Sequence, residues 1–446
     1  MYRRIDGGLP KSIHPTVTEQ ITAMETRKSK VAVVISRYGK EINGGAELHA
    51  RYLAEHLNEI FDVTVLTSCE NDDSRKNNTY YPKGEDIING IQILRFESEP
   101  KDRTNENKWL HYLDKNSIYK KARFTLSNFF KLTIKKIKYR DKNIDKIFNS
   151  WVELQGAYSP ALVNHIAANR EKYDVFIFFL YYQYTTYAGI GSVAGKSILI
   201  PIAHDDTSLH LRGFDKIFSS PAFIMYNSVS EKDWVEAAHP VAKKIKSDIA
   251  GVGRDKPDSE PLTPEEQPNI DYPYFVYIGR IHEAKGCKTL IEYFKHFKQK
   301  YINDVKLVLI GKNFMDEIET SDDIIYTGFI SEQEKSFYLE NCTGLIIPSP
   351  YESLSMVTLE AMIMGKPVLA NGYCDVLKKH IELSHAGYVY YDKEEYATAL
   401  DKLLNLTDKE KDAMVNNGIS YVEANYGWDS ILDKFSKAIN EIKRMN

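Results

Sequence analysis

From Lys30 onward, short apolar runs alternate with longer segments in which apolar residues recur at helical spacing. The runs are rich in Val, Ile and Phe and are bounded by polar residues or glycine, which favours buried strands. This alternation predicts parallel sheets covered by helices on both faces. A first series of predicted strands comprises Val31–Ser36, Val63–Thr67, Ile91–Phe96, Val175–Leu180, Ser197–Ala203 and Ala222–Tyr226. A second series comprises Tyr274–Gly279, Val305–Gly311, Ile324–Thr327, Gly344–Pro348, Pro367–Ala370 and Gly387–Tyr391.

The two series are separated by a proline-rich stretch, residues 253–273, in which five prolines forbid a continuous helix or a central strand. We therefore expect an α/β protein with two Rossmann-like, doubly wound domains, residues 30–252 and 274–427, joined by this linker. Residues 1–29 form an amino-terminal extension, and a final helix covers 428–446. Two such domains create a cleft, and ligands of open α/β sheets bind at the carboxyl ends of the strands.

A helical insertion is predicted at residues 97–158, because this stretch is long for a structureless loop. Its apolar residues recur every three, four or seven positions, as on one face of an amphipathic helix. They are Leu126, Phe130, Ile134, Ile137, Ile144, Phe148 and Val152. Between Lys115 and Lys146 there are eleven Lys or Arg residues and two acids, a formal charge of +9. Two interpretations stay open: a helix packed on the domain with solvated lysines, or a surface that docks on anionic lipid.

The composition of the whole chain adds little about partners. Of 446 residues, 43% are hydrophobic and 27% are charged, and 58 basic residues against 62 acidic ones leave a net charge of only −4. This balance gives no sign of a nucleic-acid partner. The four cysteines lie far apart with no C-x-x-C pair, so we interpret them as small buried side chains in a reducing compartment.

No targeting or membrane-spanning segment is predicted. Residues 1–29 carry charges at both ends and lack an apolar core, unlike a signal peptide. The longest apolar stretch, Val175–Tyr182, is far shorter than the roughly 18 residues that a spanning helix needs. We expect a cytoplasmic protein, with a peripheral position at the inner face of the cell membrane as the alternative.

Two glutamates flank the predicted start of a helix in the segment P-S-P-Y-E-S-L-S-M-V-T-L-E, residues 348–360. Glu352 lies in the loop after a strand, and Glu360 lies inside a helix that begins near Ser355. At ~1.5 Å per residue, that helix places Glu360 roughly 8 Å beyond its start. Free amides at a helix start favour a phosphate, and ionised carboxylates accept hydrogen bonds from sugar hydroxyls. One phosphorylated, hydroxyl-rich ligand could therefore meet both glutamates.

Two cations follow the first predicted strand of the second domain, in G-R-I-H-E-A-K-G at residues 279–286. Arg280 comes directly after the strand, and Lys285 lies at the start of the next helix. The planar fork of arginine and the compact charge of lysine can together neutralise a diphosphate without a metal.

Further candidates follow strands of the first domain. Gly44 and Gly45 open a helix and let a ligand approach the backbone. His204 and Asp205 follow the strand Ser197–Ala203, but one histidine beside two acids is a poor metal site, so no metal is expected. Tyr182 and Tyr184 belong to a tyrosine cluster that suits sugar stacking, although packing between the domains explains it equally well.

These motifs resemble those of GT-B retaining glycosyltransferases of sequence family four, the glycosyl transferases group 1. The most specific elements are the Glu352 and Glu360 pair, the G-R-I-H-E-A-K-G turn and N-G-G-A-E at 43–47, and the likeness extends from Lys30 to the last helix. The resemblance implies that this last helix crosses back to the first domain. It also implies transfer of a hexosyl or related sugar from a nucleotide diphosphate sugar to a glycan or lipid-linked acceptor, without a metal or other cofactor.

The resemblance also implies roles for individual residues. Arg280 and Lys285 would bind the donor diphosphate, Glu352 and His204 the donor sugar, and Glu360 the ribose. Asp205, Tyr182 and Tyr184 are candidates for acceptor contacts. The remaining donor-binding candidates are Gly44, Gly45, Gly279, Lys312, Phe329, Ile330, Leu354, Ser355 and Met356. Of these, Lys312, Phe329 and Ile330 belong to the stretches 311–313 and 327–330, expected to contact the base mainly through the backbone.

The sequence departs from the usual family pattern at Ser353, where a glycine is common, and at G-K-N, residues 311–313. The donor therefore stays open among UDP, GDP and dTDP sugars. Two alternative functions also stay open: a non-hydrolysing sugar-nucleotide epimerase, and a non-catalytic partner subunit. An NAD oxidoreductase is not favoured, because no G-x-G-x-x-G follows the first strand of either domain.

Overall fold

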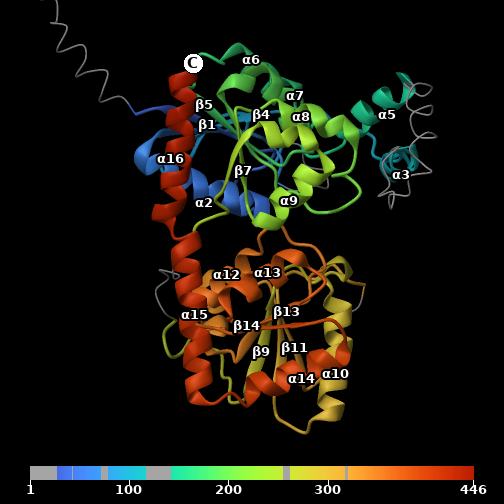
Figure 1. Ribbon diagram of the computed structural model, residues 1–446, viewed down its shortest axis with the longest axis vertical. Coiled ribbons are helices and arrows are strands. Elements are labelled where there is room, and N and C mark those ends of the chain that lie inside the picture. The colour runs from blue at the N-terminus through green and yellow to red at the C-terminus, as the bar shows by residue number, and fades with distance from the viewer. Residues whose placement is uncertain (1–27, 43, 72–78, 117–141, 255–261, 317–319) are drawn as a thin grey trace, which may run out of the picture.

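The computed structural model describes residues 28–42, 44–71, 79–116, 142–254, 262–316 and 320–446. Two sheets lie at the centres of two domains stacked end to end (Figure 1). The first domain has an eight-stranded sheet in the order β3-β4-β2-β1-β5-β6-β7-β8. Its strands are β1 (Lys30–Val34), β2 (Asp62–Ser68), β3 (Gly84–Ile88), β4 (Ile91–Phe96), β5 (Val175–Phe179), β6 (Ser197–Ile200), β7 (Phe223–Tyr226) and β8 (Lys246–Ile249).

The second domain has a six-stranded sheet in the order β11-β10-β9-β12-β13-β14. All its pairings are parallel, and the order is that of a Rossmann sheet, 3-2-1-4-5-6. Its strands are β9 (Tyr274–Ile278), β10 (Lys306–Ile310), β11 (Ile324–Gly328), β12 (Gly344–Ile347), β13 (Val368–Asn371) and β14 (Gly387–Tyr390).

Helices connect these strands. Those of the first domain are α2 (Gly45–Ile60), α3 (Glu106–Asn116), α5 (Lys142–Val152), α6 (Pro160–Ala168), α7 (Tyr184–Gly189), α8 (Asp215–Ser219) and α9 (Val229–Ala238). Those of the second domain are α10 (Cys287–Lys300), α11 (Glu332–Asn341), α12 (Met356–Ile363), α13 (Asp375–Ser384), α14 (Lys393–Leu404) and α15 (Asp408–Tyr426), and α16 (Trp428–Met445) ends the chain.

Every apolar run predicted as a strand is a strand in the structure, so the prediction of two α/β domains is confirmed. Two strands, β3 and β8, were not predicted from the sequence. β3 pairs antiparallel with β4 and is mostly exposed, and β8 is a short strand, K-S-D-I, with no buried residue. Both lie at sheet edges, where a strand needs no apolar run to be stable.

Alternate residues of the central strands point to opposite faces of each sheet, as the period of a strand requires. Val31 and Val33 pack with α2 and α16, whereas Ala32 and Val34 belong to the cluster that includes α6. In the second domain Phe275 and Tyr277 pack on α10 and α14, and Val276 faces the opposite cluster with α12. Both sheets are thus covered on both faces.

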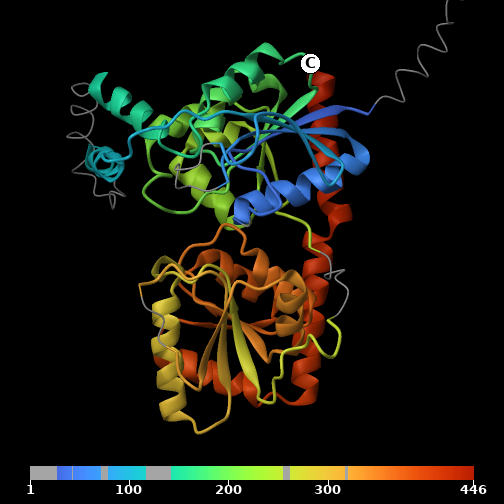
Figure 2. The ribbon, with the colours of Figure 1, turned by 180° about the vertical axis from the view of Figure 1, so that it is seen from behind.

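The last two helices connect the domains. α15 packs on α12 and α13 of the second domain, and α16 contacts α2 and β5 of the first (Figures 1 and 2). The side chains of Lys434 and Lys443 donate hydrogen bonds to Ile249 O and Ser29 Oγ, and Lys246 pairs with Glu441. The chain therefore passes between the domains twice, once before β9 and once before α16.

Most of the predicted basic segment, with Leu126, Phe130, Ile134 and Ile137, lies outside the described residues. The part that follows it is helical: α5 buries Phe148 and Val152 in the core of the first domain. Phe148 lies edge-on to Phe214, with ring centroids 5.0 Å apart. Within the described ranges, no helix is both long and apolar enough to cross a bilayer. All four cysteines are buried and free, as predicted.

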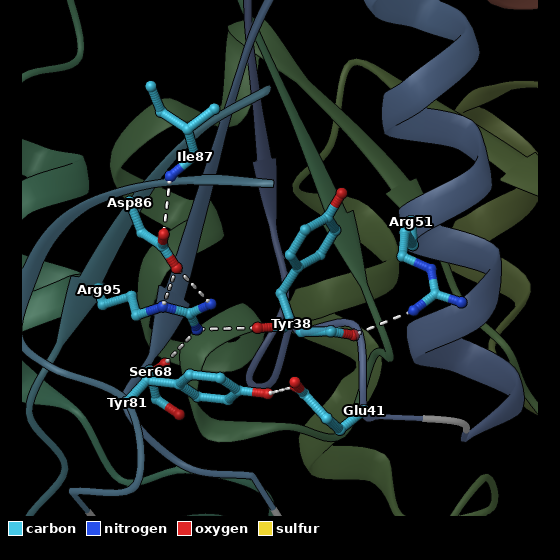
Figure 3. A network of polar contacts seen from close by, with 9 residues as sticks. Tyr38, Glu41, Arg51, Ser68, Tyr81, Asp86, Ile87 and Arg95 are labelled. Atoms are coloured by element: carbon cyan, nitrogen blue, oxygen red, sulfur yellow. Dashed lines mark hydrogen bonds and ion pairs between the residues drawn. The ribbon is translucent and has the colours of Figure 1, made fainter. Parts of the chain in front are cut away.

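A buried arginine holds the loop between β1 and α2 (Figure 3). Arg95 on β4 is 1% exposed, donates to Tyr38 O at 2.8 Å and pairs with Asp86 at 3.1 Å. The guanidinium also lies 3.9 Å from the centre of the Tyr81 ring, and the Tyr81 hydroxyl donates to Glu41. A buried guanidinium with a carboxylate, a carbonyl and an aromatic face as partners is well compensated, so the backbone at Tyr38 and the side chain of Glu41 are held in place.

Candidate functional site

The candidate residues of the second domain lie on both sides of the point where the strand order reverses. Arg280 and Lys285 follow β9, and Glu352 follows β12, the neighbouring strand on the other side. In open α/β sheets this switch point leaves a crevice at the carboxyl ends of the strands. The topology therefore brings together residues about seventy positions apart in the sequence.

Lys285 and Glu352 are in direct contact. Lys285 Nζ donates to Glu352 Oε1 at 2.8 Å, and the two side chains are 28% and 17% exposed. Gly286 permits this approach: its φ is +77°, and a Cβ at this position would lie 2.4 Å from the Pro348 carbonyl oxygen. The start of α10 therefore packs against the end of β12, and any other residue at 286 would force the two apart.

Arg280 lies at the end of β9, and its side chain is exposed. Its carbonyl accepts a hydrogen bond from the Tyr277 hydroxyl at 2.8 Å, which fixes the backbone of the turn. Toward the other described residues its guanidinium makes no hydrogen bond or ion pair. The structure thus places Arg280 on the edge of the crevice that holds Lys285 and Glu352 but does not bring the three into contact.

Glu360 on α12 is held by two cations. Its Oε1 lies 3.2 Å from Lys335 Nζ on α11 and 3.6 Å from an Nη of Arg254 in the segment that joins the domains. Burial raises the pKa of the Glu360 carboxyl, but Arg254 and Lys335 outweigh this effect and hold the pKa below its ordinary value. Glu360 is therefore an ionised hydrogen-bond acceptor. Neither cation was predicted from the sequence, because both lie on elements other than α12.

The loop between Glu352 and α12 is strained and firmly held. Ser355, the residue before the helix, has φ +61° and ψ +72°, a conformation that costs of order 1–3 kcal/mol outside glycine. Leu354 O accepts a hydrogen bond at 2.7 Å from the buried His380 Nε2, and His380 Nδ1 accepts one at 2.9 Å from the Tyr421 hydroxyl. The amides at the start of α12, including that of Met356, are thus fixed in place, and His380 is a residue that sequence reasoning missed.

The candidate base-binding residues gather at the ends of β10 and β11. Gly311 and Gly279 lie side by side, and a Cβ on Gly311 would lie 1.9 Å from the Gly279 carbonyl oxygen. Lys312 is exposed, Phe329 is 69% exposed, and Ile330 packs partly on the core. The exposed Phe329 ring beside this closely packed backbone suits stacking on a flat ring such as a nucleotide base.

His204 of the first domain lies at the cavity that Glu352 also lines. A cavity of ≈ 80 Å³ is lined by His204, Asp205 and Trp234 of the first domain and by residues 350–352 and 373–375 of the second. Among the described residues, His204 Nδ1 is a buried nitrogen with no hydrogen-bond partner. Burial lowers the pKa of His204, the Glu352 carboxylate and Asp206 act in the opposite direction, and Lys285 lowers it further. His204 is thus a neutral imidazole within the electrostatic reach of the Lys285 and Glu352 pair.

The acceptor candidates separate in the structure. Asp205 lines the cavity, and its carboxylate lies 2.7 Å from His210 Nε2. Tyr182 and Tyr184 do not line it: Tyr182 packs on the core of the first domain, and the Tyr184 ring lies 4.5 Å from that of Tyr158. The aromatic rings at the cavity are instead Trp234, Tyr351 and Tyr373, with Tyr351 58% and Tyr373 71% exposed. Trp234 lies on α9, and Tyr351 and Tyr373 lie in loops; as isolated aromatic residues they formed no motif in the sequence.

The glycine pair of the first domain stands at the start of α2, where Gly44 is the residue before the helix. The Glu47 carboxylate folds over Gly44 and pairs with Arg37 at 2.5 Å. Gly45 has open space at its Cβ position. The start of α2 was predicted to favour a phosphate. In the structure the Glu47 carboxylate, paired with Arg37, lies beside it. For the described part of the chain, no group of three or more His, Cys, Asp or Glu residues could hold a metal ion.

Comparison with known proteins identifies the second domain. Residues 258–421 match the family described as Glycosyl transferases group 1. This part of the chain is a glycosyl transferases group 1 domain. The group 1 domain contains Arg280, Lys285, Glu352 and Glu360, together with Lys335 and His380.

Curated relatives match the chain over part of its length. The lipopolysaccharide 1,2-N-acetylglucosaminetransferase of Salmonella typhimurium is 27% identical over 195 residues, 39% of this chain and 50% of that protein. The alpha-D-kanosaminyltransferase of Streptomyces kanamyceticus is 27% identical over 183 residues, 39% of this chain and 46% of that protein. The chain thus spans about half the length of the curated relatives that it matches.

Solved structures match the whole fold. Sucrose-phosphate synthase from Thermosynechococcus elongatus superposes with a TM-score of 0.64 at 16% identity, over 94% of this chain and 100% of that one. Anabaena HepE, solved in complex with UDP and glucose, gives 0.61 at 13% identity, over 93% and 100%. At these identities the likeness concerns the fold alone: the first domain and the group 1 domain together have the GT-B architecture.

Proposed function

We propose that the protein is a retaining, metal-independent glycosyltransferase that moves a hexosyl or related sugar from a nucleotide diphosphate sugar to an acceptor hydroxyl, in the synthesis of a surface polysaccharide or glycoconjugate. One observation carries this proposal: His204 of the first domain and Glu352 of the group 1 domain line one cavity, and Lys285 contacts Glu352. The relatives named as transferases and the neighbour that binds UDP and glucose support it.

The donor would lie across the group 1 domain. Its base would contact Lys312, Phe329 and Ile330, and its ribose hydroxyls would donate to Glu360, which Lys335 and Arg254 keep ionised. Its diphosphate would lie between the start of α12 and the cations Arg280 and Lys285. The sugar would then reach Glu352 and His204 at the cavity.

In the reaction, the bond between C1 of the sugar and the diphosphate oxygen breaks, and a bond to the acceptor oxygen forms on the same face. The acceptor proton passes to the departing diphosphate. Lys285 and Arg280 would stabilise the negative charge that develops on this leaving group, which is the main catalytic contribution. The acceptor, a glycan or a lipid-linked glycan, would enter past Asp205, Trp234, Tyr351 and Tyr373. The cavity between the domains would keep water from the reacting carbon.

Thermal-shift measurements with UDP, GDP and dTDP and their sugars test the donor site first, because a ligand that binds the folded state raises its melting temperature. Turnover of the stabilising donor is then followed with and without glycan acceptors. NMR of the product's anomeric proton reports retention, and EDTA should leave the rate unchanged. Epimerisation of the donor without an acceptor would indicate the epimerase, and no stabilisation by any nucleotide would indicate a non-catalytic subunit.

A further inference from the structure

The first domain contains a fully buried acidic residue, Glu231, close to the segment that holds His204. Glu231, in the first turn of α9, has no exposed surface. Among the described residues it has no basic partner. A buried carboxyl group without a cation is costly unless hydrogen bonds compensate it, so its partners indicate why it is there.

Those partners are backbone amides at the ends of two neighbouring strands. One carboxylate oxygen accepts a hydrogen bond from Ala203 N at 2.5 Å, and the other accepts one from Asn227 N at 2.5 Å. Ala203 directly precedes His204, and Asn227 directly follows β7. Ser228 Oγ in turn accepts from Glu231 N at 3.1 Å and caps α9. One side chain therefore ties the segment that carries His204 to the start of α9.

The segment needs such a tie because its backbone is strained. Ile202, two residues before His204, has φ +51°, and a β-branched residue in this region is a genuine outlier. Such strain persists only where surrounding contacts fix the conformation. The hydrogen bond from Ala203 N to the Glu231 carboxyl group holds the peptide directly after Ile202, and His204 beyond it lines the same cavity as Glu352.

We propose that Glu231 is a positioning residue that acts through the backbone of Ala203 to fix His204 in the cleft. The proposal rests on the proposed function in so far as His204 serves the donor sugar. It requires two acceptors at once. Glutamine keeps the size of the side chain but has only one acceptor, so its amide group would face one of the two backbone N–H donors.

The test compares Glu231→Gln with Asp233→Asn, an exposed site on the same helix. A readout that needs no turnover comes first: the protein is labelled at histidine Cε1, and the His204 signal is assigned with His204→Ala. Glu231→Gln should shift this signal and its titration midpoint, whereas Asp233→Asn should leave both unchanged. An unmoved His204 signal in Glu231→Gln would overturn the proposal.

The second readout is a double-mutant cycle on donor turnover. Glu231→Gln alone should lower kcat by roughly 10- to 100-fold, as expected when a contacting group is misplaced by about 1 Å, with little change in the KM for donor. In the His204→Ala background the same substitution should change kcat less than about threefold, because coupled residues are not additive. A full effect in that background contradicts the proposal.

If Glu231→Gln does not fold, Glu231→Asp keeps both carboxyl oxygens but withdraws them by one methylene, and the same shift of the His204 signal is expected. If the wild-type protein turns over no donor, the proposed function fails, while the His204 signal still decides whether Glu231 positions that residue.

Discussion

Lys285 Nζ lies 2.8 Å from Glu352 Oε1, so the cation proposed for the diphosphate and the carboxylate proposed for the sugar are partners of each other. Each one is largely buried, and each would lose its counter-charge if the other were removed. Their contributions to binding and turnover are therefore coupled, and they act as one unit at the switch point of the second sheet.

Lys285→Ala should lower kcat for sugar transfer by about 10²–10³-fold, the usual loss when one group that stabilises developing negative charge is removed. Lys288→Ala is the matched control, because Lys288 lies near the same helix start and is 64% exposed. The Lys285→Ala and Glu352→Gln pair should be strongly non-additive in steady-state assays. Near-normal turnover in Lys285→Ala would remove this residue from the site.

Gly286→Ala should destabilise the protein and weaken donor binding together. The added Cβ meets the Pro348 carbonyl oxygen, and the φ of +77° is unfavourable for alanine, which alone costs roughly 1–2 kcal/mol. We expect a lower melting temperature and a smaller thermal shift with the stabilising nucleotide. Gly191→Ala, where the Cβ would have no atom within 4 Å, should change neither. Unaltered nucleotide binding in Gly286→Ala would show that Lys285 does not depend on this close approach.

The parts of the site that sequence predicted are local, and the parts it missed are not. Strand ends and helix starts follow from apolar runs, so the sequence alone predicts that Lys285 and Glu352 lie at one crevice. Glu360 was found by its spacing from Glu352, but its partners Lys335 and Arg254 come from other elements. Trp234 and His380 belong to no sequence motif. Tertiary packing alone brings Trp234 to the cavity and His380 to the Leu354 carbonyl.

Glu360→Gln should weaken binding of the ribonucleotide and reduce discrimination against its 2′-deoxy analogue. An ionised carboxylate accepts from ribose hydroxyls, whereas an amide has one acceptor fewer, takes the negative partner from Arg254 and leaves Lys335 with Glu332 alone. A hydrogen bond to a charged group contributes about 1.5–3 kcal/mol, so we expect roughly a tenfold or larger rise in Kd by calorimetry. Equal discrimination in the variant and the wild type would place the ribose elsewhere.

His380 should make stability depend on pH in a defined window. Burial lowers its pKa from 6.5 to about 4, so between these values the unfolded chain binds a proton that the folded chain does not. The free energy of unfolding should therefore fall as the pH is lowered from about 6.5 to about 4, by up to ~1.4 kcal/mol per pH unit from His380. Above pH 6.5, His380 should contribute no pH dependence, because it is neutral in both the folded and the unfolded chain. Urea unfolding at several pH values should give a shallower slope for His380→Gln than for the wild type. The exposed His111→Gln is the control, and identical slopes for His380→Gln and the wild type would contradict the assignment.

The basic segment 115–146 should bind anionic membranes, where a lipid-linked acceptor would be found. Eleven basic residues beside an apolar stripe that continues into α5 should bind anionic vesicles, since each Lys or Arg near such a surface contributes about 1 kcal/mol. Flotation with vesicles that contain phosphatidylglycerol should carry the protein upward at physiological salt, and neutral vesicles should not. Raising the salt to about 1 M, where the screening length is ~3 Å, should release it. Glutamine at four of the lysines between 120 and 138 should abolish flotation yet leave transfer to a water-soluble acceptor intact. If the wild-type protein does not float with anionic vesicles at physiological salt, the segment does not bind lipid.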